Sequence, residues 1–147
     1  ELGNPIPRSF QSAAEFILNS KLRKAVSGDS LDLERIRSIL DETQTWKVEL
    51  DTEGLSYLLQ QTLEGMMARL VAAAEDIVLL KELLAAAEML RKLPFPVDLW
   101  KVQNLYHEML MSTYPEFQTR AERGDEAAQE WLNQFVSLAQ QLSIRVG

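Results

Sequence analysis

Residues 52–70 read TEGLSYLLQQTLEGMMARL, and this stretch decides the fold class. The side chains of one stripe recur at intervals of three and four residues over about four turns, which is the spacing that places them on a single face of an α-helix. The stripe consists of Leu55, Leu58, Leu59, Thr62, Leu63, Met66 and Leu70. The spacing predicts an amphipathic helix, and Thr52 is predicted to cap its N-terminus because a threonine hydroxyl can accept a free main-chain N–H there.

Two further helices are predicted on the N-terminal side. Ser9 is the expected N-cap of the first helix, which ends at residues 27–29, and Ser30 or Asp32 is the expected cap of the second. The second helix ends before a short connector at residues 48–50. The apolar stripes of these two helices are Phe10, Ala13, Ala14, Ile17 and Leu18, and Leu33, Ile36, Ile39 and Leu40.

Three helices are predicted on the C-terminal side. Asp76 is the expected cap of the fourth helix, which the prolines of residues 94–96 end, and Asp98 is the expected cap of the fifth. Pro115 is expected to interrupt or restart the fifth helix, and Gly124-Asp125 provides a stop and a cap before the sixth. The three stripes are Ile77, Leu80, Leu83, Leu84, Ala87 and Leu90; Leu99, Val102, Leu105, Tyr106, Met109 and Leu110; and Ala128, Trp131, Leu132, Phe135, Leu138, Ala139 and Leu142.

Together these segments predict an all-α fold, an irregular bundle of about six mostly antiparallel amphipathic helices. No segment alternates apolar and polar residues for long enough to form a half-buried strand. The short connections favour antiparallel neighbours, since a short loop returns the chain beside the helix it has just left. We expect residues 1–147 to form a single helical domain, and the start at Glu1 without an initiator methionine leads us to expect a piece of a larger protein.

Composition and charge exclude several classes of function. The chain carries 15 basic and 22 acidic side chains, a formal net charge of −7, and no cysteine. An acidic surface repels phosphate backbones and anionic membranes, so we expect neither a nucleic-acid nor a membrane partner. The lack of cysteine excludes disulfides and thiolate chemistry. No stretch approaches the roughly 18 consecutive apolar residues of a membrane span, and we expect a cytoplasmic location.

Signatures of catalysis are scarce. His107 is the only histidine, and it can be interpreted as a hydrogen-bonded group at the edge of the core or as a base in a site. The acids nearest the apolar stripes, Glu15, Glu53, Glu64 and Glu108, are interpreted as parts of solvated helix faces. The glycines match no phosphate-binding spacing. The sequence therefore predicts no catalytic residue, no metal ligand and no cofactor.

Tryptophan supplies the candidate binding residues. Trp131 lies in the centre of the last stripe and is predicted to be core. Trp100 stands one residue off its stripe, beside the proline-rich turn, with Gln103 and Asn104 one turn further on. An indole face stacks on a sugar ring while amide groups form hydrogen bonds, so a surface site is one interpretation. The other is that these side chains anchor the helix to its neighbours.

The chain resembles a known helical region over nearly its whole length. The residues that carry the resemblance are PRSF at 7–10, AAEFILN at 13–19, DTEGL at 51–55, LQQTL at 59–63 and LPFPVDLWKVQNLY at 93–106. They resemble an uncharacterised helical region in the C-terminal half of proteins whose N-terminal half is similar to glycoside hydrolase family 57.

The resemblance implies a supporting role in a carbohydrate-active protein. Family 57 enzymes act on α-glucans by a retaining mechanism with two carboxylates that lie in the N-terminal barrel, so no catalytic residue carries over to this chain. The implied partners are the catalytic domain of the same parent chain and an α-glucan. The candidate sugar contacts are Trp100, Gln103, Asn104 and His107.

Two functions from different classes follow. The first is a non-catalytic accessory domain of such an enzyme, which predicts an exposed apolar face where the missing barrel packs. The alternative is a freestanding helical module for protein interaction, which predicts only a narrow groove for a partner helix.

Overall fold

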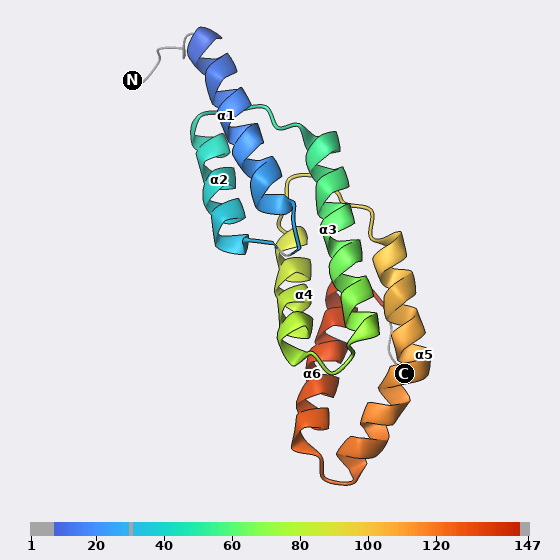
Figure 1. Ribbon diagram of the computed structural model, residues 1–147. Helices are drawn as coiled ribbons and strands as arrows, with labels where there is room; N and C mark the ends of the chain where they lie inside the picture. The colour runs from blue at the N-terminus through green and yellow to red at the C-terminus, as the bar shows by residue number, and fades with distance from the viewer. Residues whose placement is uncertain (1–7, 30, 145–147) are drawn as a thin grey trace.

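The computed structural model describes residues 8–29 and 31–144, which form six α-helices and no strand (Figure 1). The predicted all-α class is confirmed. The helices are α1 (Arg8–Val26), α2 (Leu33–Thr45), α3 (Thr52–Ala72), α4 (Ile77–Leu90), α5 (Trp100–Glu122) and α6 (Glu126–Gln141). Within the described ranges, no helix is both long enough and apolar enough to cross a membrane.

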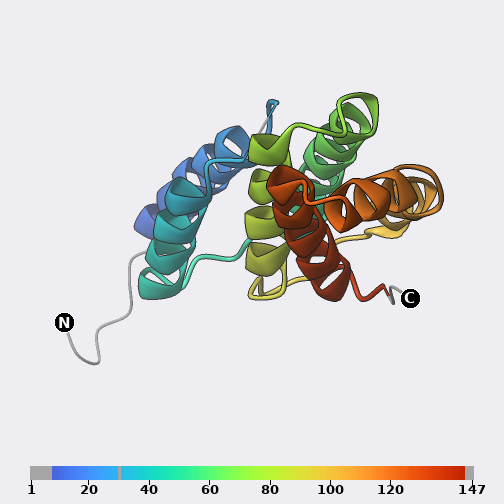
Figure 2. The same cartoon turned by 90° about the horizontal axis from the view of Figure 1, so that it is seen from below.

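The helices pack as three hairpins in a row. Helices that follow one another directly, α1 with α2, α3 with α4 and α5 with α6, form antiparallel pairs (Figure 1). The row is held together by contacts of α3 with α1 on one side and with α5 on the other, and of α4 with α6. Because the chain alternates in direction, these contacts between hairpins join helices that run the same way. Figure 2, seen along the helices, shows α1 and α2 at one end of the row and α5 at the other.

Two apolar clusters fill the space between the hairpins. The larger cluster joins the second half of α3 to α4, α5 and α6, and the smaller cluster joins α1 and α2 to the first half of α3. Met66 and Met67 of α3 are fully buried in the larger cluster. Leu55 and Leu59, from the first half of the same helix, are buried in the smaller one. The stretch from 52 to 70 therefore contributes to both cores.

Stacked aromatic rings join α5 to α6. The Trp131 ring lies between the rings of Phe117 and Phe135, with centroid distances of 3.9 and 4.6 Å, and Tyr106 stacks on Phe135 at 4.1 Å. The Tyr106 hydroxyl donates to the Phe135 carbonyl oxygen (2.6 Å), and the Trp131 indole N–H donates to the Ala74 carbonyl oxygen (2.6 Å). Burial, with a smaller contribution from Tyr114, raises the pKa of Tyr106 above its ordinary value. The predicted core position of Trp131 is confirmed.

Aspartates cap four of the helices. Asp76 and Asp125 accept main-chain N–H groups at the starts of α4 and α6, as predicted. At the start of α2 the cap is Asp32, one of the two predicted alternatives, and the other, Ser30, lies outside the described residues. The cap of α3 is Asp51 rather than Thr52, because the Asp51 carboxylate accepts the Gly54 N–H (3.1 Å) and Thr52 is already helical. Asp98 stands one residue before the N-cap of α5, Leu99, where its carboxylate accepts the Trp100 N–H (3.0 Å).

Helix α1 differs from its prediction. It already includes Arg8, so Ser9 lies inside the helix and does not cap it. Of the predicted stripe, only Leu18 is buried, while Phe10 and Ile17 are exposed. The face turned to the core carries instead Leu18, Asn19, Leu22, Ala25 and Val26. Helix α1 thus has two apolar faces. Neighbouring helices cover the face with Leu22, and the face with Phe10 and Ile17 stays exposed.

Pro115 does not interrupt α5, which continues from Trp100 to Glu122. Proline has no N–H to donate to the carbonyl four residues earlier, that of Met111, but this carbonyl belongs to an exposed residue that water can reach. Buried side chains on both sides of the proline, Met109 and Phe117, hold the two halves of the helix in the larger cluster. Tertiary packing therefore outweighs the local preference of proline.

Candidate functional site

Three of the four predicted sugar-contact residues lie on one exposed face of α5. Trp100, Asn104 and His107 are spaced by four and three residues, which puts them in line along the helix. Met111, four residues further on, extends the line, and all four side chains are exposed. We call this set the α5 stripe. The Trp100 side chain is 68% exposed, so it does not anchor α5 in the core.

Gln103 does not belong to the α5 stripe. Its side-chain amide donates to the main-chain carbonyl oxygen of Leu142 (2.8 Å), directly after the end of α6. This bond anchors α5 to α6, which is the alternative role considered for these residues. His107 is exposed rather than placed at the edge of the core.

The α5 stripe offers recognition groups but no reacting pair. An indole face, an amide and an imidazole are present on a single helix, which suits stacking and hydrogen bonding along an extended ligand. Among the residues that the structure describes, no cluster of three or more His, Asp or Glu side chains could hold a metal ion.

A second exposed surface lies on α1. Phe10, Phe16 and Ile17 are 62, 72 and 50% exposed, and Ala13 between them is also exposed. At 100° per residue these positions fall on the side of the helix opposite the buried Leu22. We call these four residues the α1 face. The sequence contained this signal, since positions 10, 13 and 17 have helical spacing, but spacing alone does not say which of two apolar faces meets the core.

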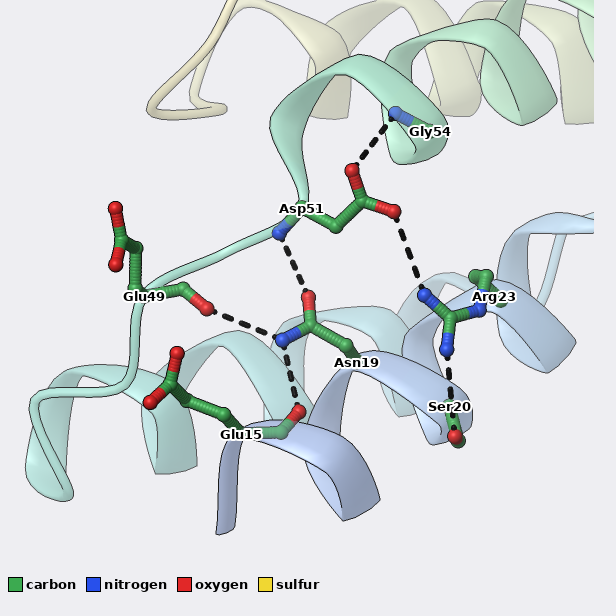
Figure 3. A network of polar contacts seen from close by, with 7 residues as sticks. All are labelled: Glu15, Asn19, Ser20, Arg23, Glu49, Asp51 and Gly54. Atoms are coloured by element: carbon green, nitrogen blue, oxygen red, sulfur yellow. Dashed lines mark hydrogen bonds and ion pairs between the residues drawn. The ribbon is translucent and has the colours of Figure 1, made fainter. Parts of the chain in front are cut away.

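Asn19 fixes α1 to the connector between α2 and α3 (Figure 3). Its amide nitrogen donates to the carbonyl oxygens of Glu15 (2.8 Å) and Glu49 (3.1 Å), and its amide oxygen accepts the main-chain N–H of Asp51 (2.8 Å). Arg23 pairs with the Asp51 carboxylate at 3.4 Å. The side chain of Asn19 is buried. A buried amide is stable in the core only when its donor and acceptor groups form hydrogen bonds, and these three bonds meet that need. The apolar pattern of the sequence does not reveal this role.

A charge network around Arg120 joins the loop before α4 to the loop before α6. The Arg120 guanidinium pairs with Glu75 (2.9 Å) and Asp125 (3.0 Å) and lies 4.7 Å from the centre of the Phe117 ring. The N–H of Ala128 and the Arg120 side chain lower the pKa of Asp125 below its ordinary value. Hydrogen bonds to Asp125 and Glu75 raise the pKa of Arg120. Arg120 and Asp125 stabilise each other's charged forms, which suits a structural ion pair and not proton transfer.

Comparison of the chain with protein-family models, with curated proteins and with solved structures found no match. The resemblance to the helical region of family 57-like proteins therefore stays a prediction.

Proposed function

We propose that the chain is a non-catalytic helical accessory domain of a carbohydrate-active protein similar to glycoside hydrolase family 57. It packs through the α1 face against the catalytic domain of the same parent chain. The observation that carries the proposal is the exposure of Phe10, Phe16 and Ile17 together on one helix. The link to α-glucans comes from the sequence resemblance.

An apolar helix face on a surface favours burial against a partner. Moving one such side chain out of water contributes roughly 1.5–3 kcal/mol, so a cluster of them costs free energy while it stays exposed. The opposite side of α1 already packs in the smaller cluster. A helix that is apolar on both sides is typical of a position between two packed layers. This supports an accessory domain over the alternative, a freestanding interaction module with a narrow groove.

The α5 stripe supports a contact with glucan on another side of the molecule. Helices α1 and α5 pack on different sides of α3 (Figure 2). A catalytic domain docked on α1 therefore leaves α5, with its exposed Trp100, uncovered. We therefore propose that Trp100, Asn104 and His107 contact the sugar and that Gln103 holds their helix in place.

The docking proposal is tested with the chain alone. Wild type is expected to bind a hydrophobic dye and to self-associate with rising concentration in sedimentation experiments. Phe16→Ser combined with Ile17→Ser is expected to abolish both effects and to leave the free energy of unfolding within about 0.5 kcal/mol, because the side chains are exposed. Val78→Ser, which removes an exposed apolar side chain from α4, is the matched control and should change neither. A strictly monomeric wild type that binds no dye would argue for the freestanding module.

The sugar contact is tested by NMR titration with malto-oligosaccharides, followed at the indole N–H signals of Trp46, Trp100 and Trp131. The Trp100 signal is expected to shift and saturate, and the response should be lost in Trp100→Ala. The buried indole of Trp131, which donates to Ala74, serves as an internal reference, and Trp46→Ala is the matched exposed control. If no indole signal moves at millimolar sugar, the chain makes no direct glucan contact on its own.

A further inference from the structure

A cavity of about 580 Å³ lies between α2, the connector that follows it and the end of α4. This volume is within the range of roughly 300–1,000 Å³ that is typical of small-molecule sites. The apolar residues of its wall come from two segments distant in the sequence, residues 37–50 and residues 89–94. They are Leu40, Val48, Leu50, Met89, Leu93 and Pro94.

The connector wall is held in position by the bonds of Asn19. Glu49 and Asp51 are fixed to Asn19 through their main chains (Figure 3). Val48 and Leu50 alternate with these two residues and line the cavity. The hydrogen bonds of Asn19 hold the main chain on both sides of Leu50, so they fix the part of the connector from which this side chain reaches the cavity. The wall is therefore built into the fold.

Polar and charged side chains complete the lining. Arg37, Asp41 and Gln44 follow one another at helical spacing along α2, and Lys92 lies just beyond α4. Arg37 and Lys92 are positive and Asp41 is negative, so the lining has a net charge of +1. The whole chain, in contrast, has a net charge of −7. In the part of the chain that the structure describes, neither Arg37 nor Lys92 takes part in an ion pair.

We propose that this cavity binds a small amphipathic anion, a molecule with a hydrocarbon body and one carboxylate. The hydrocarbon packs against Leu50 and Met89, and the carboxylate is held by Arg37 and Lys92. The charge of the lining selects the anion, because an arginine fork and a lysine ammonium complement a carboxylate that the rest of an acidic surface repels. The apolar wall selects the hydrocarbon body.

The test uses decanoate, below the concentration at which it forms micelles, and protein labelled with ¹³C at the methionine methyl groups. The Met89 methyl signal is expected to shift and saturate, while that of Met111, exposed on α5, should stay in place. Arg37→Gln and Lys92→Gln are each expected to weaken binding roughly tenfold, through loss of a charge-assisted hydrogen bond. Arg35→Gln, on an exposed position of α2 away from the cavity, is the matched control and should leave the affinity unchanged.

Two further ligands separate the contributions of the head and the body. Decanol, which has the same hydrocarbon body without the charge, is expected to bind roughly tenfold more weakly than decanoate. Acetate, which has only the carboxylate, should not shift Met89. The proposal is overturned if decanol binds as well as decanoate, if the Arg37 and Lys92 variants match Arg35→Gln, or if decanoate leaves the Met89 signal unmoved.

Discussion

Trp131→Ala is expected to lower the free energy of unfolding by about 3–5 kcal/mol. The substitution removes the ring that lies between Phe117 and Phe135 and leaves a cavity where α5 meets α6. It also leaves the Ala74 carbonyl oxygen without its indole donor. Domains of ordinary stability unfold with about 5–15 kcal/mol, so this single change removes a large part of the total.

Urea denaturation followed by circular dichroism measures this effect, and Trp100→Ala is the matched control. Trp100 loses the same atoms from an exposed position, so its free energy of unfolding should change by less than about 0.5 kcal/mol. Equal losses from the two variants would contradict the central role assigned to the stacked rings.

Asn19→Ala is expected to lower the free energy of unfolding by about 2–3 kcal/mol. The variant leaves the Glu49 carbonyl oxygen and the Asp51 N–H without the side chain that now pairs them, and an unsatisfied buried group costs about 1–3 kcal/mol. The connector is partly exposed, so water replaces some of the lost bonding. The net effect is therefore smaller than the sum of the two groups.

The same urea experiment tests this expectation with Asn104→Ala as control. Asn104 is an exposed asparagine on α5, and its truncation should be nearly neutral. Asn19→Asp adds a second check, because a carboxylate can accept the Asp51 N–H but cannot donate to the carbonyls of Glu15 and Glu49. An Asn19→Asp variant as stable as wild type would show that the donated bonds contribute nothing.

Local sequence is sufficient to predict most of this fold. The spacing in residues 52–70 predicts α3, and Asp76 and Asp125 mark the starts of α4 and α6, because capping depends only on groups within one turn. Pro115 and the first turn of α1 show where local reasoning fails. Whether a helix passes through a proline, and which of two apolar faces becomes core, is decided by packing against distant segments.

The candidate functional residues also fall into two groups, those whose placement local sequence predicts and those whose placement depends on distant segments. Trp100, Asn104 and His107 share a face of α5 because they share a helix, which spacing can predict. Gln103 bonds to a carbonyl oxygen 39 residues away, and no pattern within α5 contains that partner. The cavity beside α2 is assembled from two segments about 40 residues apart in the sequence, so it becomes visible only in the folded chain.

The placement of the α1–α2 hairpin at one end of the row has a consequence for dynamics. Opening this hairpin breaks the α1–α3 packing and the smaller cluster, while the aromatic stack between α5 and α6 stays intact. A terminal unit with one neighbour opens at lower free energy than the whole chain unfolds, so its amides exchange with solvent by subglobal opening. Any partner that covers α1, or any ligand between α2 and α4, stabilises the closed form and slows this exchange. Binding at this end of the row is thereby coupled to local order.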